Sequence, residues 1–329
     1  MNAVTNMPTR AAALSVDHVS IAGPDGPLVR DVSLTIAPGE CLGLVGESGS
    51  GKTLTARAIA DLLPAGVTRT GGEIATSSGH VGMVFQDPLG ALNPVFTIRR
   101  TMREPVMQHH ALSRRDADEH ALTLLSEVGI SEPERVAASY PHQLSGGLRQ
   151  RVMIAAALAC GPTVLLCDEP TTALDVTTQA TILNLFMRLK EERDLAILFV
   201  SHDLAVVAQI ATRVSVMYSG EIVESGRMAD ILGAPRHAYT AGLLRSIPSR
   251  GRPGERFAAI GGIPPRPYLT QPGCRFADRC DLVTPECRTV PSVLRELSGG
   301  HMSRCIHADK VSAGSRGATG AAEGRDGAA

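Results

Sequence analysis

The sequence contains no tryptophan, and aromatic residues make up only 3% of its 329 positions. A hydrophobic core must therefore be built mainly from aliphatic side chains and methionine. The chain also lacks an excess of either charge, with 32 basic residues against 33 acidic ones. This balance excludes a generally basic nucleic-acid-binding protein, although it leaves room for a local basic patch.

Long hydrophobic runs are missing as well. A membrane-spanning helix needs about 20 mostly apolar residues, and the best candidate, 152–167, is shorter and is interrupted by Gly161 and Pro162. The first ten residues have no apolar stretch of the kind that signal peptides carry, so we do not expect secretion. With 43% hydrophobic and 20% charged residues the chain is expected to fold. Its length suggests about two units.

Strand-like and helix-like segments alternate between residues 13 and 235. Alternating β-branched residues predict strands, and apolar residues three or four positions apart predict helices. Strands are expected at 14–23, 28–36, 41–46, 72–85, 163–169, 195–203, 213–220 and 221–226. Helices are expected at 53–63, 98–129, 147–159, 177–192 and 204–211. This order predicts an α/β domain whose mostly parallel sheet is covered by helices on both faces.

The two ends of the chain differ from this pattern. Nine of the 21 prolines lie between Leu232 and Lys310, so residues 236–310 are expected to be largely irregular. Residues 1–12 and 311–329 show no hydrophobic periodicity. We expect them to form a loose leader and a disordered tail.

A glycine-rich segment, GESGSGKT, follows an apolar strand and precedes a helix, and it matches G-x-x-x-x-G-K-[ST]. Its glycines let backbone N–H groups curl around phosphate oxygens, and the helix N-terminus adds positive potential. Lys52 is expected to contact the β- and γ-phosphates, and the Thr53 hydroxyl to ligate Mg²⁺. The predicted nucleotide-binding residues are Gly46, Glu47, Ser48, Gly49, Ser50, Gly51, Lys52 and Thr53. The motif indicates an NTPase but does not say which one.

Two acids follow the apolar strand 164–167. A carboxylate is costly to bury unless it is paired, so Asp168 is the expected partner of Mg²⁺, through water. Glu169 is then placed to orient or deprotonate the attacking water. Gln86 and His202 also follow apolar strands, and the carboxyl ends of parallel strands meet where phosphates bind. Alone, each of these two residues would more often be structural.

A second glycine-rich segment, LSGGLRQR, occupies 144–151 just ahead of a predicted helix. Ser145 and two glycines at a helix N-terminus form another anion-binding device. One chain does not obviously need two anion-binding segments, but a head-to-tail dimer does. In such a dimer, Ser145–Gly147 of one chain would contact the γ-phosphate bound by the phosphate-binding loop of its partner. Taken alone, the segment would be interpreted as an N-cap with a turn.

Together these motifs resemble those of the ATP-binding subunits of ABC transporters. The resemblance covers about residues 13–310 and includes GESGSGKT, Gln86, LSGGLRQR, VLLCDEP, the Ala173–Asp175 segment and His202. The stretches VGESGSGKT, FQDPLGALNP, YPHQLSGGLRQRVMIAAAL and DEPTTALDVTTQA are similar to those of the peptide/nickel import branch. The resemblance implies a P-loop NTPase (RecA-like) core at 13–235 with an antiparallel β edge. It also implies an inserted helical subdomain at about 87–150 and an irregular, cysteine-containing extension at 236–310.

The resemblance also implies a role for each motif. Glu169 would be the catalytic base, His202 the γ-phosphate switch, and Gln86 would contact both Mg²⁺ and the water. Mg²⁺ would be held by Thr53, Gln86 and Asp168. The signature loop acting on the partner's ATP would comprise Ser145, Gly146, Gly147 and Gln150. Asp175 would communicate across the dimer.

The activity implied is ATP hydrolysis coupled to import, with ATP and Mg²⁺ bound. The expected partners are a second, related ATPase subunit, two transmembrane permeases and, indirectly, a solute-binding protein; no nucleic acid is expected. The expected location is peripheral, on the cytoplasmic face of the bacterial inner membrane. The expected solute is a di- or oligopeptide, with nickel or another small solute as the alternative. A soluble ABC ATPase of repair or translation is the rival interpretation, but such proteins usually carry two cassettes or long insertions.

One position departs from the family pattern. Relatives usually carry an aromatic residue near Ile21 that stacks on adenine, and base–aromatic stacking is worth roughly 1–3 kcal/mol. The aliphatic side chain here predicts weakened ATP affinity or base preference, which Ile21→Tyr would restore.

Four of the seven cysteines fall in one C-terminal stretch. Cys41, Cys160 and Cys167 lie in apolar segments and are expected to be small core residues. The clustered four are Cys274, Cys280, Cys287 and Cys305. Their spacing matches neither the usual zinc patterns nor the ferredoxin runs. Similar tails in peptide-import ATPases look like metal or iron–sulfur sites, so a [4Fe–4S] cluster is a candidate cofactor, with Zn²⁺ as the alternative.

Each clustered cysteine has an arginine neighbour, which we expect to lower the pKa of its thiol and so favour metal binding. These arginines are Arg275, Arg279, Arg288 and Arg304. His301 and His307 are substitute ligand candidates. Three alternatives stay open: reduced thiols in a docking loop for a partner or anionic lipid, a redox sensor that gates the motor, and a structural zinc staple.

Overall fold

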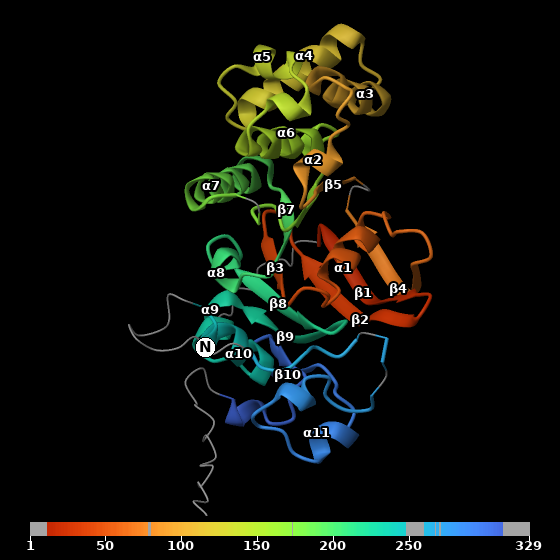
Figure 1. The fold of residues 1–329 in the computed structure, drawn as a ribbon, viewed down its shortest axis with the longest axis vertical. Helices are drawn as coiled ribbons and strands as arrows, with labels where there is room; N and C mark the ends of the chain where they lie inside the picture. The colour runs from red at the N-terminus through yellow and green to blue at the C-terminus, as the bar shows by residue number, and fades with distance from the viewer. Residues whose placement is uncertain are drawn as a thin grey trace, which may run out of the picture.

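The computed structural model describes residues 12–77, 80–172, 174–247, 260–266, 268–269 and 271–311. Nearly all of the predicted leader and tail lies outside these residues, and so does Ala173. The molecule is elongated, with helices α3, α4 and α5 at one end, the sheets in the middle and the C-terminal region with α11 at the other end (Figure 1). None of the helices in the described part of the chain is long and apolar enough to cross a membrane.

In the described residues, the central sheet has eight strands in the order β10-β11-β9-β8-β3-β7-β6-β5. Strands β8, β3, β7, β6 and β5 are parallel, whereas β9, β11 and β10 continue the sheet antiparallel. The bounds are β3 (Cys41–Val45), β5 (Val81–Val84), β6 (Val164–Asp168), β7 (Ala196–Ser201), β8 (Arg213–Tyr218), β9 (Glu221–Arg227), β10 (Arg295–Ser298) and β11 (His301–Ser303). The prediction of a mostly parallel sheet with an antiparallel edge is confirmed.

A smaller antiparallel sheet has the order β2-β1-β4. Its strands are β1 (Leu14–Gly23), β2 (Gly26–Ile36) and β4 (Thr68–Thr76). The strand-like segment expected at 72–85 is therefore split between two sheets, because β4 joins this one and β5 joins the central one.

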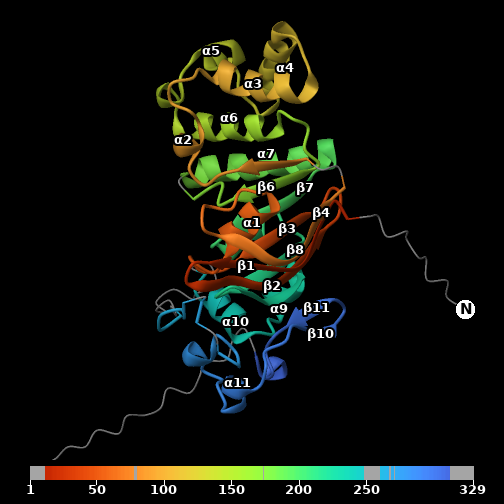
Figure 2. The same ribbon diagram turned by 90° about the vertical axis from the view of Figure 1, so that its right-hand side faces the viewer.

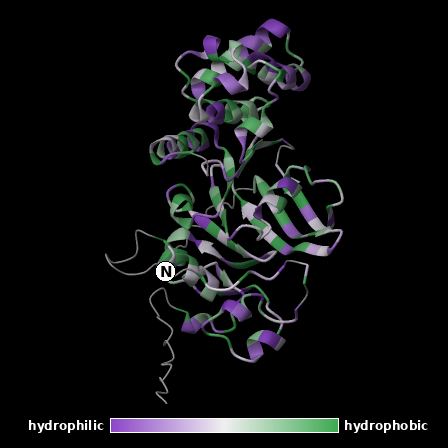
Figure 3. Cartoon of the chain, viewed as in Figure 1, coloured by the Kyte–Doolittle hydropathy of each residue, from purple (hydrophilic) through white to green (hydrophobic). Residues whose placement is uncertain are grey.

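Helices cover both faces of the central sheet (Figure 2). Leu42 and Leu44 of β3 pack into one hydrophobic cluster with helix α1 and the small sheet. Cys41 and Val45 pack into another cluster, with helices α6, α7 and α8. Because both faces of the parallel strands are covered, their side chains are buried on both sides and can all be apolar. These strands are coloured mainly hydrophobic in Figure 3.

The helices near the sheets are α1 (Lys52–Ile59), α7 (Val176–Arg193), α8 (Leu204–Val207), α9 (Met228–Gly233) and α10 (Ala238–Arg245). Those of the outer helical region are α2 (Pro88–Ala91), α3 (Ile98–His110), α4 (Arg114–Glu127), α5 (Pro133–Ala138) and α6 (Gly146–Leu158). The single helical segment expected at 98–129 is two helices. Ala111 adopts a left-handed backbone (φ 51°) and ends α3, and Ser113 caps α4.

The described part of the C-terminal region is largely irregular but contains several short elements. Besides α10 it contains α11 (Glu286–Thr289), the short 3₁₀ turns η3 (Ala277–Arg279) and η4 (Ala308–Lys310), and the β10–β11 hairpin. Strand β11 pairs with β9 through Met302–Ser225 and Ser303–Glu224. The region thus continues the central sheet, and the boundary expected at 235/236 stays a prediction.

Candidate functional site

The glycine-rich segment wraps the start of α1. Gly51 has a left-handed backbone (φ 108°), which lets the chain enter the helix at Lys52. The Lys52 ammonium donates to the carbonyl oxygens of Gly46 (2.8 Å) and Glu47 (2.9 Å). Its side chain is buried, and burial lowers the pKa of Lys52. The loop therefore holds a desolvated positive charge at a helix N-terminus, which suits phosphate.

A carboxylate and a hydroxyl meet beside this loop. The Thr53 hydroxyl donates to Asp168 Oδ1 over 2.9 Å, and Asp168 ends strand β6. Asp168 is buried, and its desolvation raises the pKa of the carboxyl group. Oxygen donors and a buried acid fit Mg²⁺, which prefers oxygen ligands, so these residues suit the expected cation.

Glu169 is the centre of a second group of polar side chains. Its Oε2 atom accepts from the Thr172 hydroxyl (3.0 Å) and from the Gln86 amide (3.5 Å), and it lies 3.1 Å from Nδ1 of His202. Glu169 has a left-handed backbone (φ 46°) directly after β6. Gln86 and His202 follow β5 and β7, so neighbouring strand ends bring the predicted residues together.

Most of these residues line one cleft of about 590 Å³, although Asp168 and Thr172 are not among its lining residues. The lining includes Glu47, Ser48, Gly49, Gly51, Lys52, Thr53, Gln86, Glu169 and His202. Leu28 of β2 and Leu243 of α10 also line it, although neither was expected from the sequence. The cleft thus combines a phosphate-binding loop with a carboxylate placed to act on water.

The expected effect of Ile21 is wrong in its structural basis. Ile21 is fully buried in the cluster beneath the small sheet, so its side chain does not face the cleft. A tyrosine there would overpack the core, and the apolar side chains that line the cleft are instead those of Leu28, Leu54 and Leu243.

The second glycine-rich segment lies apart from the phosphate-binding loop. Ser145 caps α6, its Oγ accepting from the Leu148 N–H, and Asp175 caps α7 by accepting from the Thr178 N–H. Gly146 and Gln150 line a separate cleft of about 200 Å³ with Gln86. The Gln150 side chain is buried, and its Nε2 has no partner among the described residues. Within one chain, the two segments therefore do not form a single site.

All four clustered cysteines line one small cavity of about 20 Å³. Phe276, Leu282 and Ile306 give it apolar walls. Buried thiols are the soft ligands that zinc and iron–sulfur clusters use, so the donor chemistry fits. The space suits a single ion, whereas a cluster would require the surrounding loops to spread. Within the described residues, no three His, Cys, Asp or Glu side chains are placed to hold a metal ion.

The arginines beside these cysteines form their hydrogen bonds with other groups than the thiols. Each donates to oxygen atoms elsewhere: Arg275 to Ser219, Arg279 to Glu47, Arg288 to Asp278 and Arg304 to Ile222. Burial raises the pKa of Cys274 to about 12 and of Cys280 to about 11, and it also raises that of Cys305. The prediction of arginine-lowered thiol pKa values is therefore wrong for Cys274, Cys280 and Cys305.

Of the two candidate histidines, one lies at the cavity. His301 is bound by Glu224 (2.7 Å) and is not among the lining residues, whereas His307 does line the cavity. His237, which the sequence did not single out, lies with its Nε2 3.9 Å from the Cys274 sulfur. Buried and neutral, it has its pKa lowered to about 3 by desolvation.

The fold and the cleft together define a P-loop ATPase cassette. Residues 29–172 match the family model described as ABC transporter, and residues 223–287 match "Oligopeptide/dipeptide transporter, C-terminal region". The chain therefore belongs to the ATP-binding subunits of ABC transporters, in the group that carries this C-terminal region, and it is an ATPase.

Proteins from Brucella are among its relatives. A protein of Brucella melitensis named "Putative peptide import ATP-binding protein" is 45% identical over 313 residues, which cover 87% of this chain and 93% of that protein. One of the same name from Brucella abortus is 45% identical over 293 residues, covering 84% and 88%.

Solved structures share the cassette. A dimeric bacterial ABC transporter cassette has a TM-score of 0.57 and 29% identity, over 65% of this chain and 98% of that one. The cbiO1 protein of Clostridium perfringens has a TM-score of 0.59 at 24% identity, covering 67% and 90%, and shows the fold alone.

Proposed function

We propose that this chain is the ATP-hydrolysing subunit of an importer for di- or oligopeptides. The observation that carries the catalytic proposal is the convergence of Gln86, Thr172 and His202 on the Glu169 carboxylate, next to the Thr53–Asp168 pair. The match of residues 223–287 to the oligopeptide/dipeptide C-terminal region supports a peptide as the solute, ahead of nickel.

Each part of the cleft has its own task in hydrolysis. The backbone N–H groups of Gly46–Thr53 and the Lys52 ammonium bind the phosphates. Thr53, Asp168 and Gln86 would hold Mg²⁺, which would supply positive charge to offset the negative charge developing on the phosphate oxygens. Glu169 accepts a proton from the attacking water.

His202 would orient the Glu169 carboxylate, because its Nδ1 lies 3.1 Å from Oε2 of that residue, and as a lining residue of the cleft it would contact the γ-phosphate. Its position at the end of β7 places it beside the phosphate-binding loop. His202 would therefore link the base to the γ-phosphate that the water attacks.

The separation of the two glycine-rich segments supports a head-to-tail dimer of ATPase subunits. Ser145, Gly146, Gly147 and Gln150 would then bind ATP held by the partner. Asp175, capping α7, would carry contacts across the dimer. We propose a related but different chain as the partner ATPase.

The transport complex would be completed by two transmembrane permeases, with a solute-binding protein acting through them. The chain would sit peripherally on the cytoplasmic face of the inner membrane, with the outer helices α2 to α6 contacting the permeases. No nucleic acid takes part in this proposal.

Replacing Glu169 by glutamine tests the catalytic proposal. Loss of a general base costs about 10²–10⁴-fold in rate, so phosphate release should fall by at least about 10²-fold. ATP binding should be retained, and the ATP-bound dimer should accumulate on gel filtration. Glu192→Gln, an exposed change on α7, is the matched control. Near-normal turnover by Glu169→Gln would remove Glu169 as the base.

We also propose that Cys274, Cys280, Cys287 and Cys305 bind a metal centre, a [4Fe–4S] cluster or, as the alternative, Zn²⁺. The support is that all four thiols line one apolar cavity, whose volume of about 20 Å³ suits a single ion as it stands and would have to widen for a cluster. The bound group would cross-link loops that otherwise have few regular elements.

Metal analysis and visible absorption of anaerobically purified protein test this proposal. Iron, sulfide and a broad visible band should be present, and should disappear when the four cysteines become serine. Cys160→Ser, outside the cavity, is the control. Zinc in their place would make the site a structural staple, and protein free of both metals would overturn metal binding.

A further inference from the structure

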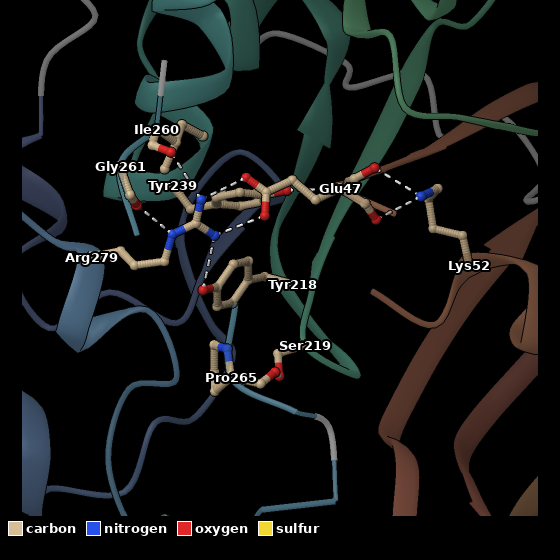
Figure 4. A network of polar contacts seen from close by, with 10 residues as sticks. Glu47, Lys52, Tyr218, Ser219, Tyr239, Ile260, Gly261, Pro265 and Arg279 are labelled. Carbon is tan, nitrogen blue, oxygen red and sulfur yellow. Dashed lines mark hydrogen bonds and ion pairs between the residues drawn. The ribbon is translucent and has the colours of Figure 1, made fainter. Parts of the chain in front are cut away.

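Glu47, the second residue of the phosphate-binding loop, is held from three sides (Figure 4). Its carboxylate forms two hydrogen bonds with Arg279, at 2.7 Å and 2.9 Å. Its backbone N–H donates to the Tyr239 hydroxyl over 2.8 Å, and its carbonyl oxygen accepts from Lys52 over 2.9 Å. Arg279 is 232 residues away in the sequence, so the C-terminal region reaches directly into the loop.

The Arg279 side chain is also held by groups other than Glu47. Its side chain is only 4% exposed. It donates to the carbonyl oxygens of Gly261 (2.7 Å) and Ile260 (3.2 Å), and to the Tyr218 hydroxyl (3.2 Å). A planar guanidinium held this way is preorganised for a two-bond contact with a carboxylate.

The same arginine directly precedes Cys280, which lines the cysteine cavity. It ends the η3 turn, which separates Cys274 from Cys280. Phe276, one of the cavity walls, stacks edge-on against Tyr218 with ring centroids 5.3 Å apart, and lies 5.4 Å from Tyr239. A continuous set of packed side chains therefore joins the cavity wall to the residues that hold Glu47.

The charge of Glu47 is expected to affect the binding of ATP. Glu47 lines the cleft that would receive the triphosphate. Paired with Arg279, its carboxylate is neutralised; unpaired, it would repel the phosphates and leave the loop free to shift. Removing one partner of a buried charged pair usually costs more than removing both.

We propose that Arg279 is a positioning residue for ATP binding, which neutralises and orients Glu47 so that the phosphate-binding loop is preformed. The inference rests on the proposed function, because it assumes that this loop binds ATP. It makes the cysteine-bearing region part of the nucleotide site of its own chain. Displacement of that region would then weaken ATP binding without any change in Lys52, Thr53 or Asp168.

A double-mutant cycle on the full chain separates this role from a merely structural one. The variants are Arg279→Gln, Glu47→Gln, the two combined, and Arg279→Lys. Arg288→Gln is the matched control, because Arg288 lies in the same region and pairs with the exposed Asp278 away from the loop. The dissociation constant for ATP with Mg²⁺ is measured by competition with a fluorescent ATP analogue, and thermal unfolding is followed in parallel.

Arg279→Gln should weaken ATP binding by about tenfold, since one unpaired charge remains. The double variant should bind more tightly than Arg279→Gln but more weakly than the wild type, because the unpaired charge is gone while the loop is no longer held by the pair. Arg279→Lys, which keeps the charge but not the planar fork, should fall between Arg279→Gln and the wild type. Arg288→Gln should match the wild type. If Arg279→Gln does not fold, the ATP dissociation constants of Arg279→Lys and of the double variant are compared with that of the wild type instead.

ATP binding by the wild type and by the variants distinguishes a failure of the proposed function from a failure of the inference. A wild-type chain that binds no ATP overturns the proposed function, and the inference with it. A wild type that binds ATP, with Arg279→Gln and Arg279→Lys binding equally well, overturns the inference alone. A double variant as weak as Arg279→Gln, with a matching loss of thermal stability, assigns the pair to folding and also overturns it.

Discussion

At the scale of single residues, the phosphate-binding loop depends on close contact between its backbone and β8. A Cβ atom added to Gly46 would lie 2.1 Å from the Met217 carbonyl oxygen. A backbone atom cannot move aside cheaply, unlike the end of a flexible side chain. Gly46 is therefore required by packing against the sheet, in addition to any contact with phosphate.

Replacing Gly46 by alanine should displace the loop from β8. Overpacking of this kind costs about 1–3 kcal/mol, so thermal unfolding should begin at a lower temperature. ATP binding should also weaken, because the loop carries the phosphate contacts. Gly71→Ala on β4, where a Cβ would meet nothing within 4 Å, is the control. A Gly46→Ala protein with wild-type stability and ATP affinity would contradict the close-packing argument.

At the scale of elements, the sequence predicts what local patterns encode. The strand expected at 14–23 is β1, because its alternating residues mark two faces. Helix α1, expected to reach residue 63, ends at Ile59, and Asp61 has a left-handed backbone (φ 57°). Neither glycine nor proline marks this end, or the break at Ala111. These boundaries depend on tertiary packing that a single sequence does not display.

The candidate site divides in the same way. Asp168, Gln86 and His202 could be brought together from the sequence, because each ends or follows a strand of one parallel sheet. The Glu47–Arg279 pair could not, since it joins segments 232 residues apart. The expected effect of the arginines on the neighbouring thiols fails for a related reason. Adjacency in sequence does not determine the direction of a side chain, and packing directs them to other partners.

At the scale of the whole molecule, the C-terminal region is joined to the cassette through buried polar contacts. Glu224 of β9 is fully buried. Its carboxylate accepts from the N–H groups of Arg236 (2.6 Å) and His237 (2.9 Å), and lies 2.7 Å from Nε2 of His301. Arg304 donates to the Ile222 carbonyl oxygen over 2.7 Å. Removing the region would leave a buried carboxylate short of a partner, which is costly.

Shortening the chain tests whether the cassette is independent of this region. A chain ending at Ile247 loses His301, Arg279 and the β10–β11 hairpin, and exposes the edge of β9. It should unfold at a lower temperature than the full chain and bind ATP more weakly, because Glu47 is left unpaired. A chain ending at Val311, which keeps all of these contacts, is the control and should behave as the full chain does. A chain ending at Ile247 with unchanged thermal unfolding and unchanged ATP affinity would show that the cassette stands alone, and that the contacts at Glu224 and Glu47 are dispensable.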